Sequence, residues 1–257
     1  MSEKIAFVTG GTGGLGSAIV TRLLAESYQV LPWSRHPAPK GTRVGAGRLW
    51  SPALDVQQSL AAWHSHVSAD IEAYGTPDVL VVAHGAAPCV KATVDLTEAD
   101  VETVWRTDLW GTFAACQTVG RAMLAHRRGS IVIVSSIHSK VTYPQRLPYS
   151  VAKSALSGLV RSLALEWGPH GVTVNAVCPW QCAGVRTERF IAAAAARGED
   201  LRAAYLECSP LGRLIEPSEV AAAVLFLVQN RAFNGVELVL DGGVSQSMWY
   251  KSFGEHA

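Results

Sequence analysis

The chain has 257 residues, a hydrophobic fraction of 49% and a formal net charge of +1. A charge this close to zero offers no electrostatic surface for nucleic acid or an anionic membrane, and no apolar run approaches the roughly 20 residues of a membrane helix. Five cysteines without a CxxC motif or metal-ligand spacing, and an N-terminus without the apolar core of a signal peptide, predict a cytoplasmic protein with no metal site.

Short apolar segments alternate along the chain with longer segments of helical period. The segments that predict strands are KIAFVTG (4–10), YQVLPWS (28–34), PDVLVVAHG (77–85), GSIVIVSS (129–136), GVTVNAVCP (171–179) and GVELVLDGG (235–243). A weaker seventh strand, RLWSPALDV (48–56), contains Pro52, which favours an edge position. The predicted helices lie at about 15–27, 57–74, 98–126, 149–167 and 217–229.

This alternation predicts a doubly wound α/β fold of the Rossmann type. Strands that are apolar throughout are buried on both faces, so we expect a seven-stranded parallel sheet with right-handed crossovers. No break in composition indicates a second domain, and we expect a single domain over residues 1–257. A helical excursion is expected at about 184–216, where the Ala-rich stretch is a strong helix former. Such sheets bind ligands beyond the carboxyl ends of their strands.

A glycine cluster follows the first predicted strand and opens the first helix, in AFVTGGTGGLGSAIV (6–20). Glycines there permit a tight turn and let backbone N–H groups approach a pyrophosphate at the positive end of the helix. The spacing Gly10-x-x-x-Gly14-x-Gly16 is wider than the common G-x-G-x-x-G. The strand–turn–helix context predicts a nucleotide-binding turn, and a turn without a ligand is the alternative.

The end of the second predicted strand selects the nucleotide. VLPWSRHP (30–37) places Ser34 and Arg35 where an acid would bind the ribose 2′-hydroxyl of NAD. Arginine presents a planar fork that suits the 2′-phosphate of NADP, and Ser34 adds a hydroxyl donor. The pair therefore favours NADP(H), and a solvated loop arginine is the alternative.

Tyr149 precedes Lys153 by four residues at the start of a predicted helix, in YSVAK. Side chains at positions i and i+4 share a helix face, so the phenol and the ammonium point the same way. A free phenol has a pKa of about 10, and a neighbouring ammonium favours the phenolate. The pair is a candidate acid/base, although the pattern alone also fits an ordinary tyrosine beside a solvated lysine.

Several motifs in the same order make the chain resemble the short-chain dehydrogenase/reductase family from end to end. TGGTGGLG (9–16) resembles its cofactor turn, and LDV (54–56) resembles its adenine-contacting acid. IVIVSS (131–136) followed by YSVAK (149–153) resembles its Ser–Tyr–Lys triad, with Ser136 thirteen residues before Tyr149. VNAVCP (174–179), SPLGRLIEPSEVAAAVLFL (209–227) and VLDGG (239–243) resemble the segment beside the nicotinamide and the C-terminal third.

The resemblance implies an NADP(H)-dependent oxidoreductase that interconverts a small secondary alcohol and a ketone by hydride transfer. Tyr149 would exchange a proton with the substrate oxygen, Ser136 would hydrogen-bond the same oxygen, and Lys153 would hold the ribose hydroxyls. The cofactor-binding residues that it implies are Gly10, Thr12, Gly13, Gly14, Leu15, Gly16, Ser34, Arg35, Asp55, Val56, Ala83, Gly85, Tyr149, Lys153 and Pro179.

Asp108 departs from the family pattern in RTDLWGTF, because the family has asparagine there as a fourth catalytic residue. A carboxylate can also hold a relay water, so Asp108 is a candidate catalytic residue, with a structural acid as the alternative. Its charge near Lys153 would offset part of the effect of the ammonium on the phenol. The family's Asn-Asn-Ala-Gly segment also departs and reads Val82–Gly85, in which we interpret His84 as a packing histidine.

The segment after the fifth long strand departs as well. Trp180 follows Pro179 where the family has glycine, and Thr187 arrives three residues later than the family pattern places it. Tryptophan cannot replace glycine where the backbone crowds a nicotinamide. We therefore expect a rerouted loop rather than Trp180 as a wall of the pocket.

The residues between the candidate serine and tyrosine commonly line the substrate cleft in this family. Here they include His138 and Tyr143, which we predict as substrate residues, together with Gln145 and Arg146. This polar rim favours a hydroxylated or anionic carbonyl compound. Two alternatives stay open, namely a 3-oxoacyl-thioester reductase and a catalytically silent NADP-binding sensor.

We expect a homotetramer, mainly because related enzymes pair the long helices before and after the catalytic strand. The segment VETVWRTDLWGTFAACQTVGRAML (101–124) is apolar around most of its circumference, which is more than one sheet-facing stripe requires. A symmetric dimer of dimers would bury the excess.

Overall fold

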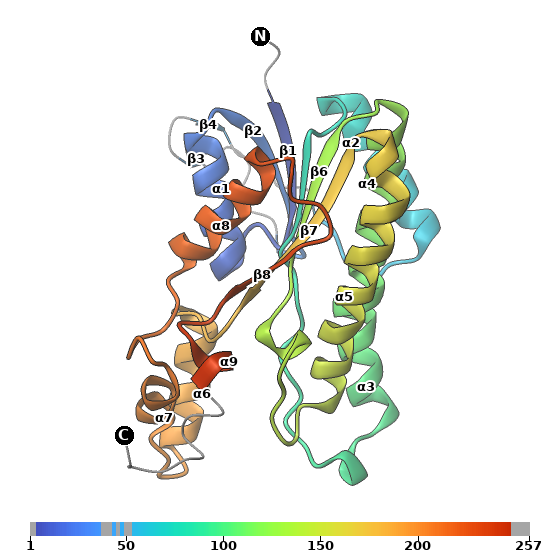
Figure 1. The fold of residues 1–257 in the computed structure, drawn as a ribbon. Coiled ribbons are helices and arrows are strands. Elements are labelled where there is room, and N and C mark those ends of the chain that lie inside the picture. The colour runs from blue at the N-terminus through green and yellow to red at the C-terminus, as the bar shows by residue number, and fades with distance from the viewer. Residues whose placement is uncertain (1–3, 37–42, 45–46, 49–52, 248–257) are drawn as a thin grey trace.

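A parallel sheet of six strands forms the centre of the computed structural model, which describes residues 4–36, 43–44, 47–48 and 53–247 (Figure 1). The strands are β1 (Lys4–Thr9), β2 (Tyr28–Trp33), β5 (Val79–Val82), β6 (Gly129–Val134), β7 (Val172–Pro179) and β8 (Glu237–Leu240), in the order β2-β1-β5-β6-β7-β8. Every residue of β5, β6 and β7 is buried, as expected for strands covered on both faces. The strand order reverses between β1 and β5, and a ligand crevice is expected beyond their carboxyl ends.

The seventh strand that the sequence predicts at 48–56 is not part of this sheet within the described residues. Ala53 forms only an isolated parallel bridge to Ser34, and Leu54 N donates to the Ser34 carbonyl oxygen at 3.0 Å. Residues 49–52 lie outside the described part of the chain. Proline has no N–H for a ladder, so Pro52 opposes an extended strand at this edge. A separate antiparallel pair is formed by β3 (Arg43–Val44) and β4 (Gly47–Arg48).

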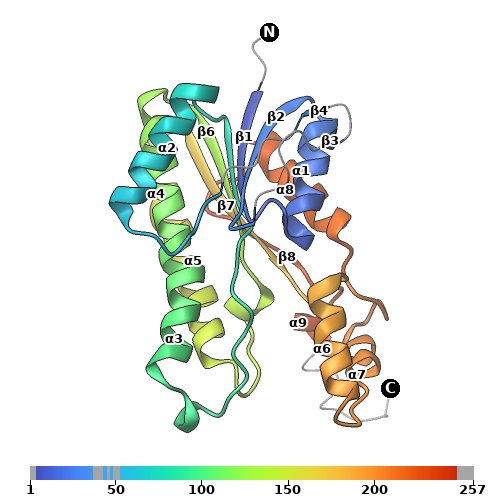
Figure 2. The same ribbon diagram turned by 180° about the vertical axis from the view of Figure 1, so that it is seen from behind.

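Helices cover both faces of the sheet (Figures 1 and 2). α1 (Gly14–Ala25) and α8 (Pro217–Gln229) lie on one face, and α2 (Leu60–Tyr74), α4 (Gly111–Ala125) and α5 (Leu147–Trp167) lie on the other. Each layer closes its own apolar core. Trp63 and Met123 are wholly buried in the layer of α2, α4 and α5, and Ile19 is wholly buried in the layer of α1 and α8. Short 3-10 turns connect elements at Thr93–Asp95, Ile137–Ser139 and Gly168–His170.

The single helix that the sequence predicts at 98–126 is divided in the structure. α3 (Glu98–Trp105) passes through a π-helical turn, Arg106–Trp110, into α4. Thr112 Oγ1 donates to the Asp108 carbonyl oxygen at 2.7 Å, and the Asp108 side chain accepts from Ala86 N at 2.8 Å. The wider turn thus brings Asp108 beside the segment that follows β5. π turns are rare and occur frequently at functional sites.

The expected excursion at 184–216 contains α6 (Val185–Ala195) and α7 (Leu201–Cys208). Together with α9 (Val244–Ser247), these helices lie beyond the carboxyl ends of the strands, on the opposite side from α3 and the beginning of α5 (Figure 2). Among the residues that the structure describes, no helix has the length and apolarity required to cross a membrane.

Candidate active site

The turn after β1 leaves the N-terminus of α1 open toward an anion. Gly10 has a φ of +66°, and a Cβ on it would lie 2.9 Å from the Ala83 carbonyl oxygen. A Cβ on Gly16 would overlap the Gly10 carbonyl oxygen, whereas a Cβ on Gly14 would meet open space. Gly13 caps α1 without a side-chain hydrogen bond, and the first turn holds no acidic residue. The first N–H groups of α1 are therefore available to a phosphate.

Ser34 and Thr12 meet at the end of β2. Thr12 Oγ1 donates to Ser34 Oγ at 2.6 Å, and the exposed Arg35 follows directly. The parallel bridge between Ser34 and Ala53 brings the segment after Ala53 alongside the end of β2. The exposed Asp55 and the buried Val56 therefore lie at the same edge of the sheet as Ser34. The structure therefore brings together the residues predicted for the 2′-phosphate and those predicted for the adenine.

Ser136, Tyr149 and Lys153 converge around His138. Ser136 Oγ accepts from His138 N at 3.2 Å, which leaves the serine proton for another acceptor. The rings of His138 and Tyr149 pack edge-on with centroids 5.3 Å apart, and Lys153 Nζ lies 5.3 Å from the centroid of the Tyr149 ring. Tyr149 and Lys153 thus lie together at the start of α5, and His138 connects the Tyr149 ring to the turn that begins at Ser136.

Asp108 and Lys153 form a buried pair behind Gly85. Lys153 Nζ lies 3.8 Å from Asp108 Oδ2, and the two side chains are 4% and 0% exposed. Within the described residues, Asp108 Oδ2 has no hydrogen-bond partner. A Cβ on Gly85 would lie 3.2 Å from Asp108 Oδ1 and 3.8 Å from Lys153 Nζ, so a larger residue there would crowd the pair. The aspartate that replaces the family's asparagine therefore faces the lysine.

His84 holds the Val82–Gly85 segment in place of the family's amides. Its Nδ1 lies 2.7 Å from Thr9 Oγ1, and its Nε2 lies 3.1 Å from the Thr107 carbonyl oxygen. A carbonyl only accepts, so Nε2 carries the proton and Nδ1 accepts from the Thr9 hydroxyl. Burial lowers the pKa of His84 to about 4, and the ring is neutral near pH 7. His84 thereby links β1 to the π turn that presents Asp108.

A row of aromatic rings continues from the site toward α7. Its members, which we call the aromatic row, are His138, Tyr143, Trp180 and Tyr205, with successive centroids 5.2, 5.6 and 6.2 Å apart. Trp180 N donates to the Leu240 carbonyl oxygen at 2.8 Å, so the backbone continues its pairing with β8 for one residue beyond Pro179, and the rerouting expected for the following loop stays a prediction. Tyr205 was missed by sequence reasoning, since nothing in the linear pattern connects it to Trp180.

His138 and Tyr143, the predicted substrate residues, are both neutral near pH 7. Burial lowers the pKa of His138 to about 4, and the charges of Arg146 and Lys153 act in the same direction. Burial raises the pKa of Tyr143 to about 12. His138 Nδ1 lies 3.2 Å from Ser150 Oγ, which orients the ring. The pair can therefore hydrogen-bond a ligand without contributing a charge.

Arg186 crosses from the start of α6 to the segment after β5, a contact that sequence reasoning missed. Its Nη2 donates to the Gly85 carbonyl oxygen at 3.0 Å. Thr187, which the family pattern places near the cofactor, is instead buried and hydrogen-bonds the Cys182 carbonyl oxygen and Gln181 Nε2. The sequence could have indicated Arg186, because it is a basic residue directly before Thr187.

The described residues contain no group of three histidine, cysteine or acidic side chains that could hold a metal ion. All five cysteines are free thiols. Burial raises the pKa of Cys116 and of Cys182 to about 12, so both stay protonated near pH 7.

Comparisons with known proteins match nearly the whole chain. A family model described as "Enoyl-(Acyl carrier protein) reductase" matches residues 10–245. The D-threitol dehydrogenase of Mycolicibacterium smegmatis is 33% identical over 253 residues, which covers 95% of this chain and 93% of that protein. The NAD-dependent glycerol dehydrogenase of Listeria innocua is 31% identical over 247 residues, which covers 95% of this chain and 94% of that protein.

A solved structure also resembles the chain closely. A variant of actinorhodin polyketide ketoreductase with NADPH superposes with a TM-score of 0.84 at 28% identity, covering 94% of this chain and 97% of that one. The motifs, the geometry of the site and these matches agree with one another. The chain therefore belongs to the short-chain dehydrogenase/reductase family and is an oxidoreductase that acts on alcohols or ketones.

Proposed function

We propose that the protein interconverts a secondary alcohol and a ketone with NADP(H), with Tyr149 as the general acid and base. The observation that carries this proposal is the position of Tyr149 between Lys153 on one side and the Ser136–His138 turn on the other. These groups lie beyond the carboxyl ends of the strands, where doubly wound sheets bind their ligands.

The proposed mechanism assigns one task to each side chain. When bound, the cofactor supplies or accepts the hydride at its nicotinamide ring. In the direction of reduction, the Tyr149 hydroxyl donates its proton to the substrate oxygen, while the Ser136 hydroxyl hydrogen-bonds the same oxygen as negative charge develops on it. The Lys153 ammonium stabilises the phenolate that remains. In the direction of oxidation, the phenolate accepts the proton from the alcohol.

The residues present fit NADP(H). The uncapped N-terminus of α1 and the open space at Gly14 leave room for a pyrophosphate. Thr12, Ser34 and Arg35 would hold the 2′-phosphate, because their segments meet at the end of β2 and none of them is acidic. Asp55 and Val56 would line the adenine site, Ala83, Gly85 and Pro179 the nicotinamide side, and Lys153 would hold the ribose hydroxyls.

Replacing Tyr149 by phenylalanine tests the assignment of the proton. The variant should lose about 10²–10⁴-fold in turnover, because the ring is kept and only the transferable proton is removed. Binding of NADPH, measured by fluorescence titration, should remain unchanged. Tyr28→Phe is the matched control, since Tyr28 is buried in β2. Half of the wild-type turnover in the Tyr149 variant would assign the proton to another group.

A second candidate function is reduction of a 3-oxoacyl thioester. The resemblance to a polyketide ketoreductase and the description of the matching family model support it. An assay of threitol, glycerol and acetoacetyl-CoA with both cofactors, followed by nicotinamide absorbance, separates the two functions. Turnover in this assay would also exclude a silent NADP-binding sensor, a role that does not require the convergent Ser136, Tyr149 and Lys153.

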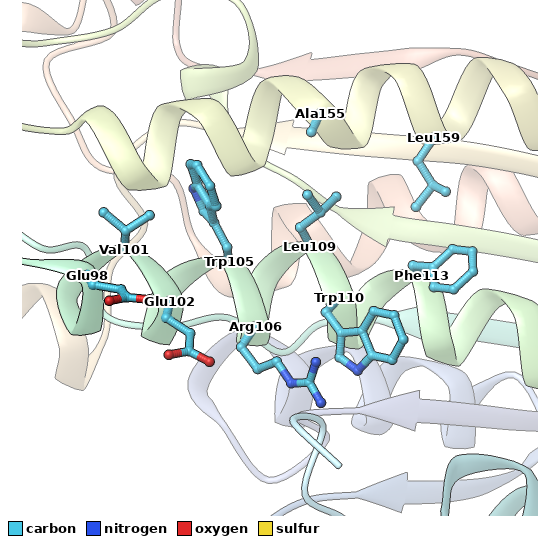
Figure 3. A pocket seen from close by; sticks show the side chains of 10 residues that line it. All are labelled: Glu98, Val101, Glu102, Trp105, Arg106, Leu109, Trp110, Phe113, Ala155 and Leu159. Atoms are coloured by element: carbon cyan, nitrogen blue, oxygen red, sulfur yellow. The ribbon is translucent and has the colours of Figure 1, made fainter. Parts of the chain in front are cut away.

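We propose further that the protein forms a homotetramer. An open groove lies between α3–α4 and α5, and Figure 3 shows Val101, Trp105 and Leu109 pointing toward α5. Its apolar lining includes Trp105, which is 39% exposed although its Nε1 donates to the Pro148 carbonyl oxygen at 3.0 Å. A second copy of the same helices would cover this groove by twofold symmetry. The cytoplasmic location stays a prediction from the sequence.

A further inference from the structure

Arg146 places a positive charge beside the proposed active site. It is half-buried at the N-cap of α5, and among the described residues no acidic side chain forms an ion pair with it. Its Nη1 is buried and has no hydrogen-bond partner in that part of the chain. A buried donor without a partner is costly, so a group that satisfies it would bind favourably.

The position of Arg146 relates it to both ends of the aromatic row. It caps the N-terminus of α5, and Tyr149 lies in the first turn of that helix. Its charge contributes to the lowered pKa of His138 and opposes the rise that burial causes in the pKa of Tyr205. The guanidinium therefore lies close to the rings that line the substrate side of the site.

The acid whose charge acts on the neighbouring Tyr143 is bound elsewhere. Asp241 accepts hydrogen bonds from Gly243 N at 2.9 Å and from Ser245 N at 2.7 Å, and it forms no ion pair with Arg146. In the same row, Trp180 Nε1 is buried and has no hydrogen-bond partner among the described residues. Arginine and tryptophan only donate hydrogen bonds, so the complementary ligand group is an acceptor with negative charge.

We propose that Arg146 binds a carboxylate of the substrate, and that the protein accordingly prefers hydroxy- or oxo-carboxylates to neutral alcohols of the same shape. This inference rests on the proposed function, because the carboxylate belongs to the molecule whose hydroxyl meets Tyr149. The planar fork of arginine matches the two oxygens of a carboxylate, and the partly buried position strengthens the charge-assisted hydrogen bonds.

Matched pairs of substrates test the preference. The pairs are 4-hydroxycyclohexanecarboxylate and its carboxamide, 3-hydroxybutyrate and 3-hydroxybutyramide, and gluconate and sorbitol. We expect wild type to favour the acid of at least one pair, and Arg146→Gln to lower kcat/KM for that acid by about 10- to 100-fold with a change of less than about twofold for its neutral partner. Arg146→Lys should recover part of the loss, because it keeps the charge without the fork.

The control variant is Arg161→Gln, which removes the same charge from an exposed position of α5 and should alter neither member of a pair. Equal losses for the acid and its neutral partner in Arg146→Gln would overturn the inference. A wild-type preference for the neutral member of every pair would overturn it as well.

Binding without turnover separates this inference from the proposed function. Calorimetric titration of each acid into the NADPH complex of Tyr149→Phe should show binding. In the double variant that also carries Arg146→Gln, this binding should be weaker by the same factor of about 10 to 100. Equal affinity in both backgrounds, or no binding of any of the three acids, would overturn the role of Arg146 while the proton assignment stands. Conversely, full turnover by Tyr149→Phe would overturn the proton assignment, and the titrations would still decide the role of Arg146.

Discussion

Replacing Asp108 by asparagine should shift the pH dependence of alcohol oxidation toward lower pH. The carboxylate lies 3.8 Å from Lys153 Nζ, and its charge opposes the effect of the ammonium on proton release by Tyr149. Asparagine keeps an oxygen that can accept from Ala86 N, a hydrogen bond of 2.8 Å in the wild-type protein. The substitution therefore removes one charge with little change in packing.

The size of the shift follows from the geometry. Asp108 Oδ2 is 3.8 Å from Lys153 Nζ, which is 5.3 Å from the centroid of the Tyr149 ring, so the carboxylate oxygen and the ring centre are no more than about 9 Å apart. At that distance the Coulomb repulsion between the Asp108 carboxylate and the Tyr149 phenolate is about 0.5 to 1.8 kcal/mol for effective dielectric constants of about 80 to 20. This corresponds to about 0.3 to 1.3 pH units.

The assay is a pH–rate profile of both proteins at saturating NADP with the best alcohol of the substrate panel. We expect the half-maximal pH of Asp108→Asn to lie below that of wild type by this amount. Asp95→Asn is the control, because it removes the same charge from an exposed 3-10 turn. A shift to higher pH would refute the electrostatic reasoning, and an unchanged midpoint would show that the carboxyl group carries no charge at the working pH.

Three further predictions concern the cofactor, the assembly and acid stability. Arg35→Asp should weaken NADP(H) binding by about 10- to 100-fold and improve NAD(H) binding in fluorescence titrations; equal wild-type affinity for both cofactors would contradict the assignment. Leu109→Glu should lower the mass measured by light scattering, because it places charges in the shared groove, whereas a monomeric wild type would contradict the tetramer. The pKa of His84 is about 4, below the ordinary 6.5, so the unfolded chain gains its proton first and stability falls as pH drops through this range. In urea unfolding, the free energy of unfolding should fall by up to about 2 kcal/mol by pH 5, which is an upper limit because His84 is partly exposed. The variant His84→Gln should remove this pH-dependent loss.

The sequence alone determined the features that depend on local patterns. Runs of apolar residues predicted the six central strands, and the start and stop signals of α8 placed that helix at 217–229, as observed. The glycine turn, the end of β2 and the Tyr149–Lys153 spacing were readable for the same reason, since their chemistry requires particular residues at short separations. The pairing of Ser136 with Tyr149 as candidate catalytic residues came from the family resemblance.

The tertiary structure decided the features that depend on partners distant in the sequence. Whether the segment at 48–56 joins the sheet depends on pairing with β2, and the described residues show a single bridge there. The π turn within 98–126 places Asp108 within hydrogen-bond distance of Ala86 N, a contact that no helical periodicity contains. Trp180 meets Tyr205, and Arg186 meets Gly85, only because the excursion folds back over the carboxyl ends of the strands. Local propensity acts over a few residues, whereas these contacts are selected by the packing of the whole chain.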